Sequence, residues 1–250
     1  MAGHSQFANI KHRKGAQDAK KAKIFTKIIL EITVSAKSGQ PDPEFNPRLR
    51  NAIIEARNNN MPKDRVDAAI KKVIAGTDGD NFEEIRFEGY APNGIALIVE
   101  ALTDNRNRTA SEVRSIFTKM GGALGETGSV GFMFDRVGVI QFESKVASEE
   151  KIFESAIEAG ADDVEINPEF YIIFTQPENF ITVRDILTKQ FGDATSAKLD
   201  WKAKNLMEIS DLDQAQKLLK MVDLLDDCDD VKNDTGNYSF SDEVAKLLGD

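Results

Sequence analysis

The feature that most constrains the fold of this chain is a change in sequence periodicity near residue 80. Before it, apolar residues recur at helical spacing, and Ile24, Ile28 and Ile32 repeat every four residues. Such a stripe is typical of an amphipathic helix. After it, short strand-like apolar runs are separated by turn residues and further helical stretches. We therefore expect an α+β multidomain protein that begins with a helical domain.

Three helices are predicted before the change. The first spans about residues 16–37, and a loop with three prolines follows it, which is a firm break. The second spans about 47–58, and the third begins at Pro62, a residue favoured in the first turn of a helix. Residues 76–79, Gly-Thr-Asp-Gly, end the third helix and form the expected linker.

The next segment predicts a hairpin followed by a helix. Strands are expected at 84–90 and 95–102, joined by the turn sequence Ala-Pro-Asn-Gly at 91–94. A helix then begins at Thr109, because Thr109-Ala-Ser-Glu112 matches a capping box. The pair Gly121-Gly122 is expected to end this helix.

Residues 137–204 show the order strand, helix, strand, strand, helix, strand, which is that of a ferredoxin-like unit. The segment before this unit lacks a final helix and strand, and the tail supplies both, at about 212–225 and 231–238. We therefore expect two α/β (ferredoxin-like) domains, the second inserted in the first. The predicted domains are listed by residue: 1–79, basic and helical with an N-terminal arm; 80–136 plus 205–250; and the inserted 137–204.

Charge is segregated along the chain. Residues 1–75 hold 15 Lys and Arg against 7 Asp and Glu, a net charge of +8, whereas the other 175 residues carry −18. A basic segment on an acidic body indicates a polyanionic partner, and nucleic acid fits because each neutralised phosphate releases condensed counterions. The alternative is that the basic helices are simply solvated faces.

We call residues 1–27 the basic arm. The candidate nucleic-acid-binding residues are side chains of this arm and of one later loop: Lys11, His12, Arg13, Lys14, Lys20, Lys21, Lys23, Lys27, Arg106 and Arg108. The two arginines precede the helix predicted from Thr109, where free N–H groups and the helix dipole favour phosphate. The alternative is structural, with Asp104 and the neighbouring asparagines holding the turn and the arginines in surface salt bridges.

Catalytic and metal sites are not expected. The chain has two histidines, His4 and His12, and one cysteine, Cys228, so no His/Cys metal cluster can form. Carboxylates surround Cys228 and would raise the pKa of its thiol.

The glycines between 121 and 128 lack the Gly-Lys-Ser/Thr of a phosphate loop, and a helix stop with a bend explains them better. The acidic run 226–230 is expected to be a solvated helix end rather than a Mg²⁺ site.

A non-enzymatic protein without cofactor or small-molecule substrate is therefore expected. No apolar run approaches the roughly 20 residues of a membrane span, and the N-terminus lacks the apolar core of a signal peptide. We expect a cytoplasmic location and no membrane partner. The oligomeric state is left open.

Several motifs give the chain a resemblance to the YebC/PmpR family. They are Met1-Ala-Gly-His-Ser5, Asn9-Ile-Lys-His-Arg-Lys14, Asn60-Met-Pro-Lys-Asp64, Glu88-Gly-Tyr90, the stretch 100–109 and Gly121-Gly-Ala-Leu-Gly125. They follow the family order over at least residues 1–130. One departure is Gln6-Phe7, where the family often has Lys-Trp.

The resemblance implies a three-domain regulator of gene expression. The family's formal assignment is a DNA-binding transcriptional regulator. The alternative is a ribosome-associated translation factor that binds rRNA and tRNA and relieves stalling at proline-rich stretches. The sequence shows no evident helix-turn-helix recognition helix, and a Lys-rich arm suits the irregular surface of folded RNA. These two points favour the alternative.

Overall fold

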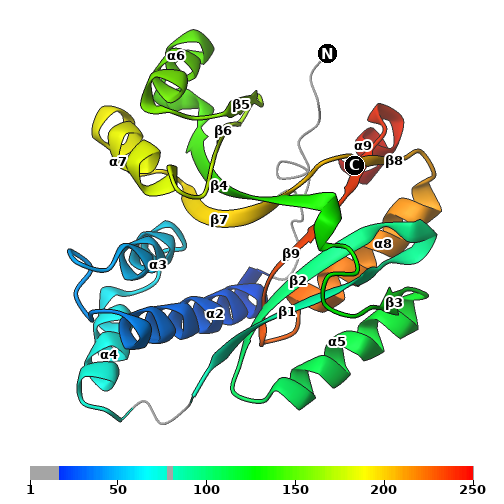
Figure 1. Ribbon diagram of the computed structural model, residues 1–250, viewed down its shortest axis with the longest axis horizontal. Helices are drawn as coiled ribbons and strands as arrows, with labels where there is room; N and C mark the ends of the chain where they lie inside the picture. The colour runs from blue at the N-terminus through cyan, green and yellow to red at the C-terminus, as the bar shows by residue number, and fades with distance from the viewer. Residues whose placement is uncertain (1–16, 78–80, 250) are drawn as a thin grey trace. The chain divides into compact units, whose positions relative to one another are not determined.

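The computed structural model describes residues 17–77 and 81–249 (Figure 1). These residues divide into two compact units. The first unit contains residues 28–77 and 136–201, and the second contains 17–27, 81–135 and 202–249. N-terminal helices followed by α/β sheets confirm the predicted α+β multidomain fold. The boundaries given above for three separate domains stay a prediction.

The N-terminal helices of the described part are α2 (Gln17–Ser38), α3 (Pro47–Asn58) and α4 (Lys63–Ile74). The apolar stripe of α2 is buried at Ile28 and Ile32. Asn46 organises the proline-containing loop, because its side chain accepts a hydrogen bond from Leu49 N–H (3.0 Å) and donates one to the carbonyl of Ser35 (2.7 Å). A side chain that accepts from the first turn in this way is a helix N-cap, and α3 begins directly after it.

The first unit also contains the ferredoxin-like sheet. Its strand order is β5-β6-β4-β7, and helices α6 and α7 pack on one face through buried residues such as Ile152, Val183 and Phe142. The elements follow the predicted order: β4 (Phe134–Glu143), α6 (Glu149–Ala159), β5 (Asp163–Ile166), β6 (Phe170–Thr175), α7 (Phe180–Phe191) and β7 (Ser196–Ala203).

Polar contacts join the helical region to this sheet within the first unit. Arg184 of α7 is only 4% exposed, and its guanidinium donates to the side-chain oxygen of Asn51 in α3 (2.7 Å). Arg57 forms an ion pair with Asp193 (2.9 Å). A buried guanidinium with hydrogen-bonded partners fixes the geometry of a contact, so the helices and the sheet pack as one body.

The second unit is built on the sheet β3-β1-β2-β9. Its strands are β1 (Glu83–Tyr90), β2 (Ala96–Thr103), β3 (Ala123–Leu124) and β9 (Val231–Gly236). Strand β9 pairs antiparallel with β2, for example Leu97 with Gly236. The tail therefore completes a sheet begun before residue 104, which is the insertion predicted from the sequence.

Helices α5 (Arg106–Met120) and α8 (Leu212–Asp226) pack against this sheet (Figure 1). Buried Val113 and Phe117 of α5 meet Met221 of α8 in one hydrophobic core with Leu97 of β2. Gly121 ends α5 in the left-handed conformation (φ 83°), which glycine adopts at no steric cost.

The predicted start of α5 was wrong. The helix begins three residues earlier, at Arg106, because the side chain of Asn105 accepts from Arg108 N–H (3.1 Å) and is the N-cap. Thr109 instead lies in the first turns and bonds to Asp230 through its hydroxyl. The sequence did not predict four elements: β3, β8 (Met207–Ile209), β10 (Tyr238–Phe240) and α9 (Asp242–Gly249). Strand β10 pairs parallel with β8.

Candidate nucleic-acid interface

The structure describes half of the predicted binding side chains. Lys11, His12, Arg13 and Lys14 lie outside the described residues, and Lys20 lies in α2 with its side chain outside them. The other five, Lys21, Lys23, Lys27, Arg106 and Arg108, all belong to the second unit. Lys21 is exposed, with its ammonium 5.9 Å from the ring centroid of Phe25.

Lys23 and Lys27 are engaged within the protein. Lys23 donates to the carbonyl (2.9 Å) and carboxylate (3.1 Å) of Asp227, and Lys27 donates to the carbonyl of Asp226 (2.7 Å). These carbonyls end α8, where backbone acceptors lack helical partners and the dipole is negative. Burial lowers the pKa of Lys27, against the opposing charge of Asp226. The acidic run expected to be a solvated helix end therefore receives two lysines of α2.

Arg108 is tied to two carboxylates. Its guanidinium lies 2.8 Å from Asp104 and 2.8 Å from Asp230. Asp230 also accepts from the hydroxyls of Thr109 (2.6 Å) and Thr103 (3.1 Å). Burial would raise the pKa of Asp230, but these hydrogen bonds outweigh it and hold that pKa below its ordinary value. These contacts of Arg108 match the structural alternative, in which the arginine forms salt bridges within the protein and does not contact a phosphate.

Arg106 has different surroundings from Arg108. It is the first residue of α5 and is exposed, and its side chain makes no hydrogen bond or ion pair with any residue that the structure describes. The two arginines are therefore not brought together into one anion site. Only Arg106 keeps its donors for an external phosphate.

The glycine-rich loop after α5 already holds an anionic group of the protein. The buried Glu88 accepts from the backbone N–H groups of Val130 (2.9 Å) and Gly131 (2.6 Å). Burial raises the pKa of Glu88, but these backbone donors outweigh it and lower the pKa overall. The backbone donors of Val130 and Gly131 are thus occupied by a carboxylate of the protein.

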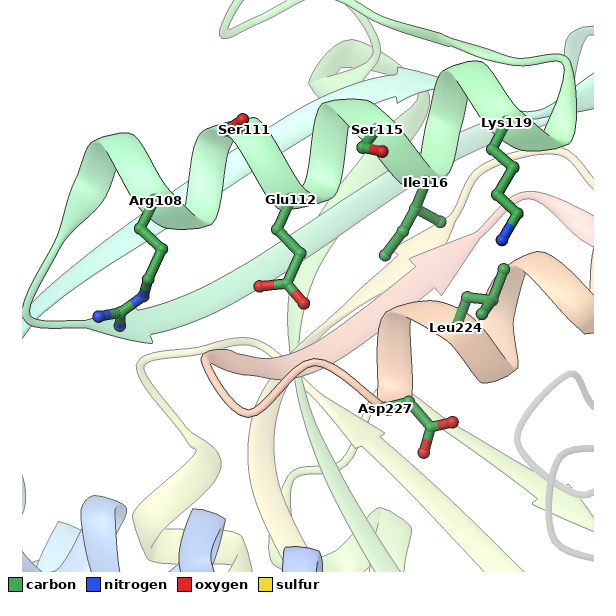
Figure 2. A pocket seen from close by; sticks show the side chains of 8 residues that line it. All are labelled: Arg108, Ser111, Glu112, Ser115, Ile116, Lys119, Leu224 and Asp227. Carbon is green, nitrogen blue, oxygen red and sulfur yellow. The ribbon is translucent and has the colours of Figure 1, made fainter.

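A groove in the second unit was not predicted. It has a volume of about 550 Å³ and runs beside α5 near the C-terminal end of α8. Glu112, Ile116 and Lys119 point from α5 toward Leu224 and Asp227 (Figure 2). A count of charges for each element, rather than for residues 1–75 and for the rest, would have drawn attention to α5.

Other classes of site were also sought among residues 17–77 and 81–249. In this part of the chain, no three or more His, Cys, Asp or Glu side chains cluster in a way that could hold a metal ion. None of the helices in the same ranges has the length and apolar character needed to cross a membrane.

Comparison with known proteins places the chain in a family. Residues 5–76 match the TACO1/YebC protein N-terminal domain, and residues 82–238 match the TACO1/YebC second and third domain. The chain therefore belongs to the TACO1/YebC family, which confirms the resemblance seen in the sequence.

Relatives cover nearly the whole chain. A "probable transcriptional regulatory protein" of Rickettsia bellii is 54% identical over 248 residues, covering 99% of this chain and 97% of the relative. A protein of the same name from Rickettsia felis is 53% identical over 249 residues, covering 99% of this chain and 98% of the relative. The crystal structure of a conserved hypothetical protein from Aquifex aeolicus matches with a TM-score of 0.87 and 45% identity, over 96% of this chain and 99% of that one.

Proposed function

We propose that this protein is a non-enzymatic regulator of gene expression that binds nucleic acid through its basic N-terminal part. The observation that carries the proposal is the segregation of charge, +8 over residues 1–75 against −18 over the rest. Like charges held together bring no folding benefit, but they raise affinity for a polyanion.

Duplex DNA is the first candidate target. The relatives named as probable transcriptional regulatory proteins favour it. Helices α3 and α4 are also joined by only four residues, with Asn60 in the left-handed conformation (φ 57°). A short turn between two helices is the connection of a helix-turn-helix, and α4 carries exposed Lys63, Lys71 and Lys72. This short connection agrees with the helices predicted at 47–58 and from Pro62, although no recognition helix was evident in the sequence.

Ribosomal RNA and tRNA are the second candidate, through a role as a ribosome-associated factor that relieves stalling at proline-rich stretches. The groove beside α5 favours it, because an open groove with an apolar floor suits an unstacked base. Bases of this kind are exposed in single-stranded and looped RNA.

The test changes the arm while sparing the lysines that hold α8. In the arm variant, five residues become Gln: Lys11, Arg13, Lys14, Lys20 and Lys21. The matched control changes five exposed lysines elsewhere: Lys151, Lys189, Lys217, Lys220 and Lys246. Binding is measured as retention on duplex DNA and as co-sedimentation with ribosomes, both over a salt series.

We expect the arm variant to lose binding and the control to keep it. If all five side chains meet phosphates of duplex DNA, the slope of log K against log salt falls by about 4.5, roughly 0.9 for each contact. Equal losses in the two variants would show that only net charge matters and would overturn the proposal. Preference for the DNA column or for the ribosome decides between the two candidates.

A further inference from the structure

Helix α5 is a basic element in an acidic unit. Four of the five Lys and Arg residues between 81 and 135 lie on it, and its only acidic residue is Glu112. Outside α5, residues 81–135 and 202–249 hold 7 Lys and Arg against 18 Asp and Glu. Arg108 is paired with Asp104 and Asp230, so the other three basic side chains of α5 provide its local attraction for an anion.

The outer face of α5 carries short polar and basic side chains. Val113, Phe117 and Met120 are buried on the inner face. The exposed residues on the opposite side are Asn107, Ser111, Glu112, Arg114, Ser115, Thr118 and Lys119, so one carboxylate lies among the polar and basic side chains. The side chains of Arg114 and Lys119 make no hydrogen bond or ion pair with any part of the chain that the structure describes. Their donors therefore remain available to a ligand.

The helix is held firmly from within. Its first turns are tied to Asp230 through Thr109 and Arg108, and its inner face packs in the core of the unit. A surface on a rigid element binds without the cost of ordering it first. The backbone of α5 is therefore fixed before a ligand binds to its outer face.

The groove of about 550 Å³ lies along one edge of this face. Ile116 and Leu224 provide its apolar surface (Figure 2). Its polar lining includes Ser115 and Lys119 together with the carboxylates of Glu112 and Asp227, which can accept hydrogen bonds from the N–H groups of a base but not from a phosphate. The groove is open to solvent, so it can cover one face of a base but cannot enclose it. A planar heterocycle can thus be covered on an apolar surface beside a cation.

We propose that the outer face of α5 and this groove bind a single-stranded segment of RNA. Arg114 and Lys119 contact phosphates; they are about 8 Å apart along the helix axis and about 140° apart around it, so they lie on the two edges of the outer face. The hydroxyls of Ser111 and Ser115 donate to and accept from the ribose 2′-OH, which can do both. One unstacked base enters the groove against Ile116. This inference rests on the proposed nucleic-acid binding and names a second surface for it.

Single-stranded RNA is the occupant that fits both parts of the surface. The cations can pair with a phosphate backbone, and the groove can cover a base that is free of its stack. A duplex satisfies the first requirement only. The row of hydroxyls adds a reason to prefer ribose over deoxyribose.

The experiment uses the full chain and a labelled 20-nucleotide RNA of mixed sequence, with the same sequence as single-stranded DNA and as duplex DNA. The variant is Arg114→Gln with Lys119→Gln. Its matched control is Lys217→Gln with Lys220→Gln, which removes the same charge from exposed positions of the neighbouring α8. We expect about tenfold weaker RNA binding in the variant, and a salt slope reduced by about 1.4, roughly 0.7 for each phosphate.

A second variant, Ser115→Glu, places a negative charge beside the groove at an exposed helical position without removing a cation. It is expected to weaken RNA binding while the thermal unfolding curve is unchanged. Because the added charge also lowers the general attraction for RNA, the variant supports the groove only if binding falls by more than in the single change Lys217→Gln, which alters the net charge by the same amount.

The outcomes separate the two proposals. If the wild type binds RNA and the α5 variants bind as well as the control, this inference is overturned and the proposed function stands. If the variants lose only duplex binding, single-stranded RNA is the wrong occupant. If the wild type binds none of the three nucleic acids, the proposed function fails and this inference fails with it.

Discussion

Two groups of cations in the second unit differ in what they touch. Lys23, Lys27 and Arg108 donate to carbonyls and carboxylates of the segment 226–230. Arg114 and Lys119 have no such partner among the described residues. The sequence shows all five as basic side chains. In the described part of the chain, however, only the second group has hydrogen-bond donors that no carbonyl or carboxylate occupies.

The difference shows that available charge depends on contacts distant in sequence. Lys23 is separated from Asp227 by 204 residues, and Arg108 from Asp230 by 122. The same acidic run thus neutralises basic residues of both α2 and α5. Three predictions test this division, starting with the carboxylate that has the most partners.

Asp230→Asn is expected to give the largest effect. Asp230 accepts from Arg108, Thr109 and Thr103, and its side chain is only 14% exposed. Loss of its charge weakens three hydrogen bonds in a partly buried network, so the free energy of unfolding should fall by about 2 kcal/mol. Chemical denaturation of the wild type and the variant measures this change.

The pH dependence gives a second readout of the same variant. Because the folded-state pKa of Asp230 lies below its ordinary value of 3.8, its contribution is present above that value and is lost as pH falls through the lower folded pKa. Wild-type stability should therefore decline more steeply below about pH 4 than that of Asp230→Asn. Parallel pH profiles would contradict the network.

Changing both Lys23 and Lys27 to Gln is expected to give a smaller loss, below about 1 kcal/mol, because the Lys23 pair is partly exposed. The local effect should be clearer. Backbone amides of residues 21–27 should exchange faster with solvent, since the start of α2 loses its contacts with the end of α8.

Cys228 reports on the same contact. Burial, together with a hydrogen bond to Glu112, raises the pKa of its thiol to about 12 from 9.0, which leaves roughly a thousandfold less thiolate than in an ordinary cysteine. Alkylation of Cys228 should be slow in the wild type and faster in the double variant. Weaker nucleic-acid binding with unchanged exchange and alkylation would instead place both lysines in the interface.

Much of the fold could be predicted because local signals agree with it. Asn46 and Ser148 cap α3 and α6, Gly121 and Gly160 end α5 and α6, and the apolar patterns match the buried faces. The failures have local causes. Asn105 and Thr109 both suit an N-cap, and only the tertiary bond to Asp230 removes Thr109 from that role. Strand β3 has two residues, too few to carry a period.

The candidate site was less predictable, because the sequence shows which side chains are charged but not which groups of the folded chain they contact. The arm was identified by its lysines, but nothing local indicates that Lys27 meets the end of α8. The fitness of Arg114 for binding depends likewise on the absence of a nearby carboxylate, which is a tertiary property. Trp201 shows the same limit. An aromatic residue on a strand suggests core packing, yet Trp201 is partly exposed, and the guanidinium of Arg136 lies 4.9 Å from its ring centroid.

The smallest effects are expected for single changes of the two loop arginines, and they divide the pair. Arg108→Ala removes the partner of Asp104 and Asp230, so the melting temperature should fall, by less than in Asp230→Asn, with nucleic-acid affinity unchanged. Arg106→Ala should leave the melting temperature unchanged, because the side chain has no partner in the described part of the chain, and should weaken binding by up to about tenfold. Melting curves and binding isotherms on both variants provide the test. If both variants lose affinity equally, Arg108 also contacts the nucleic acid. If Arg106→Ala is destabilised, Arg106 has a structural role and does not belong to the binding surface.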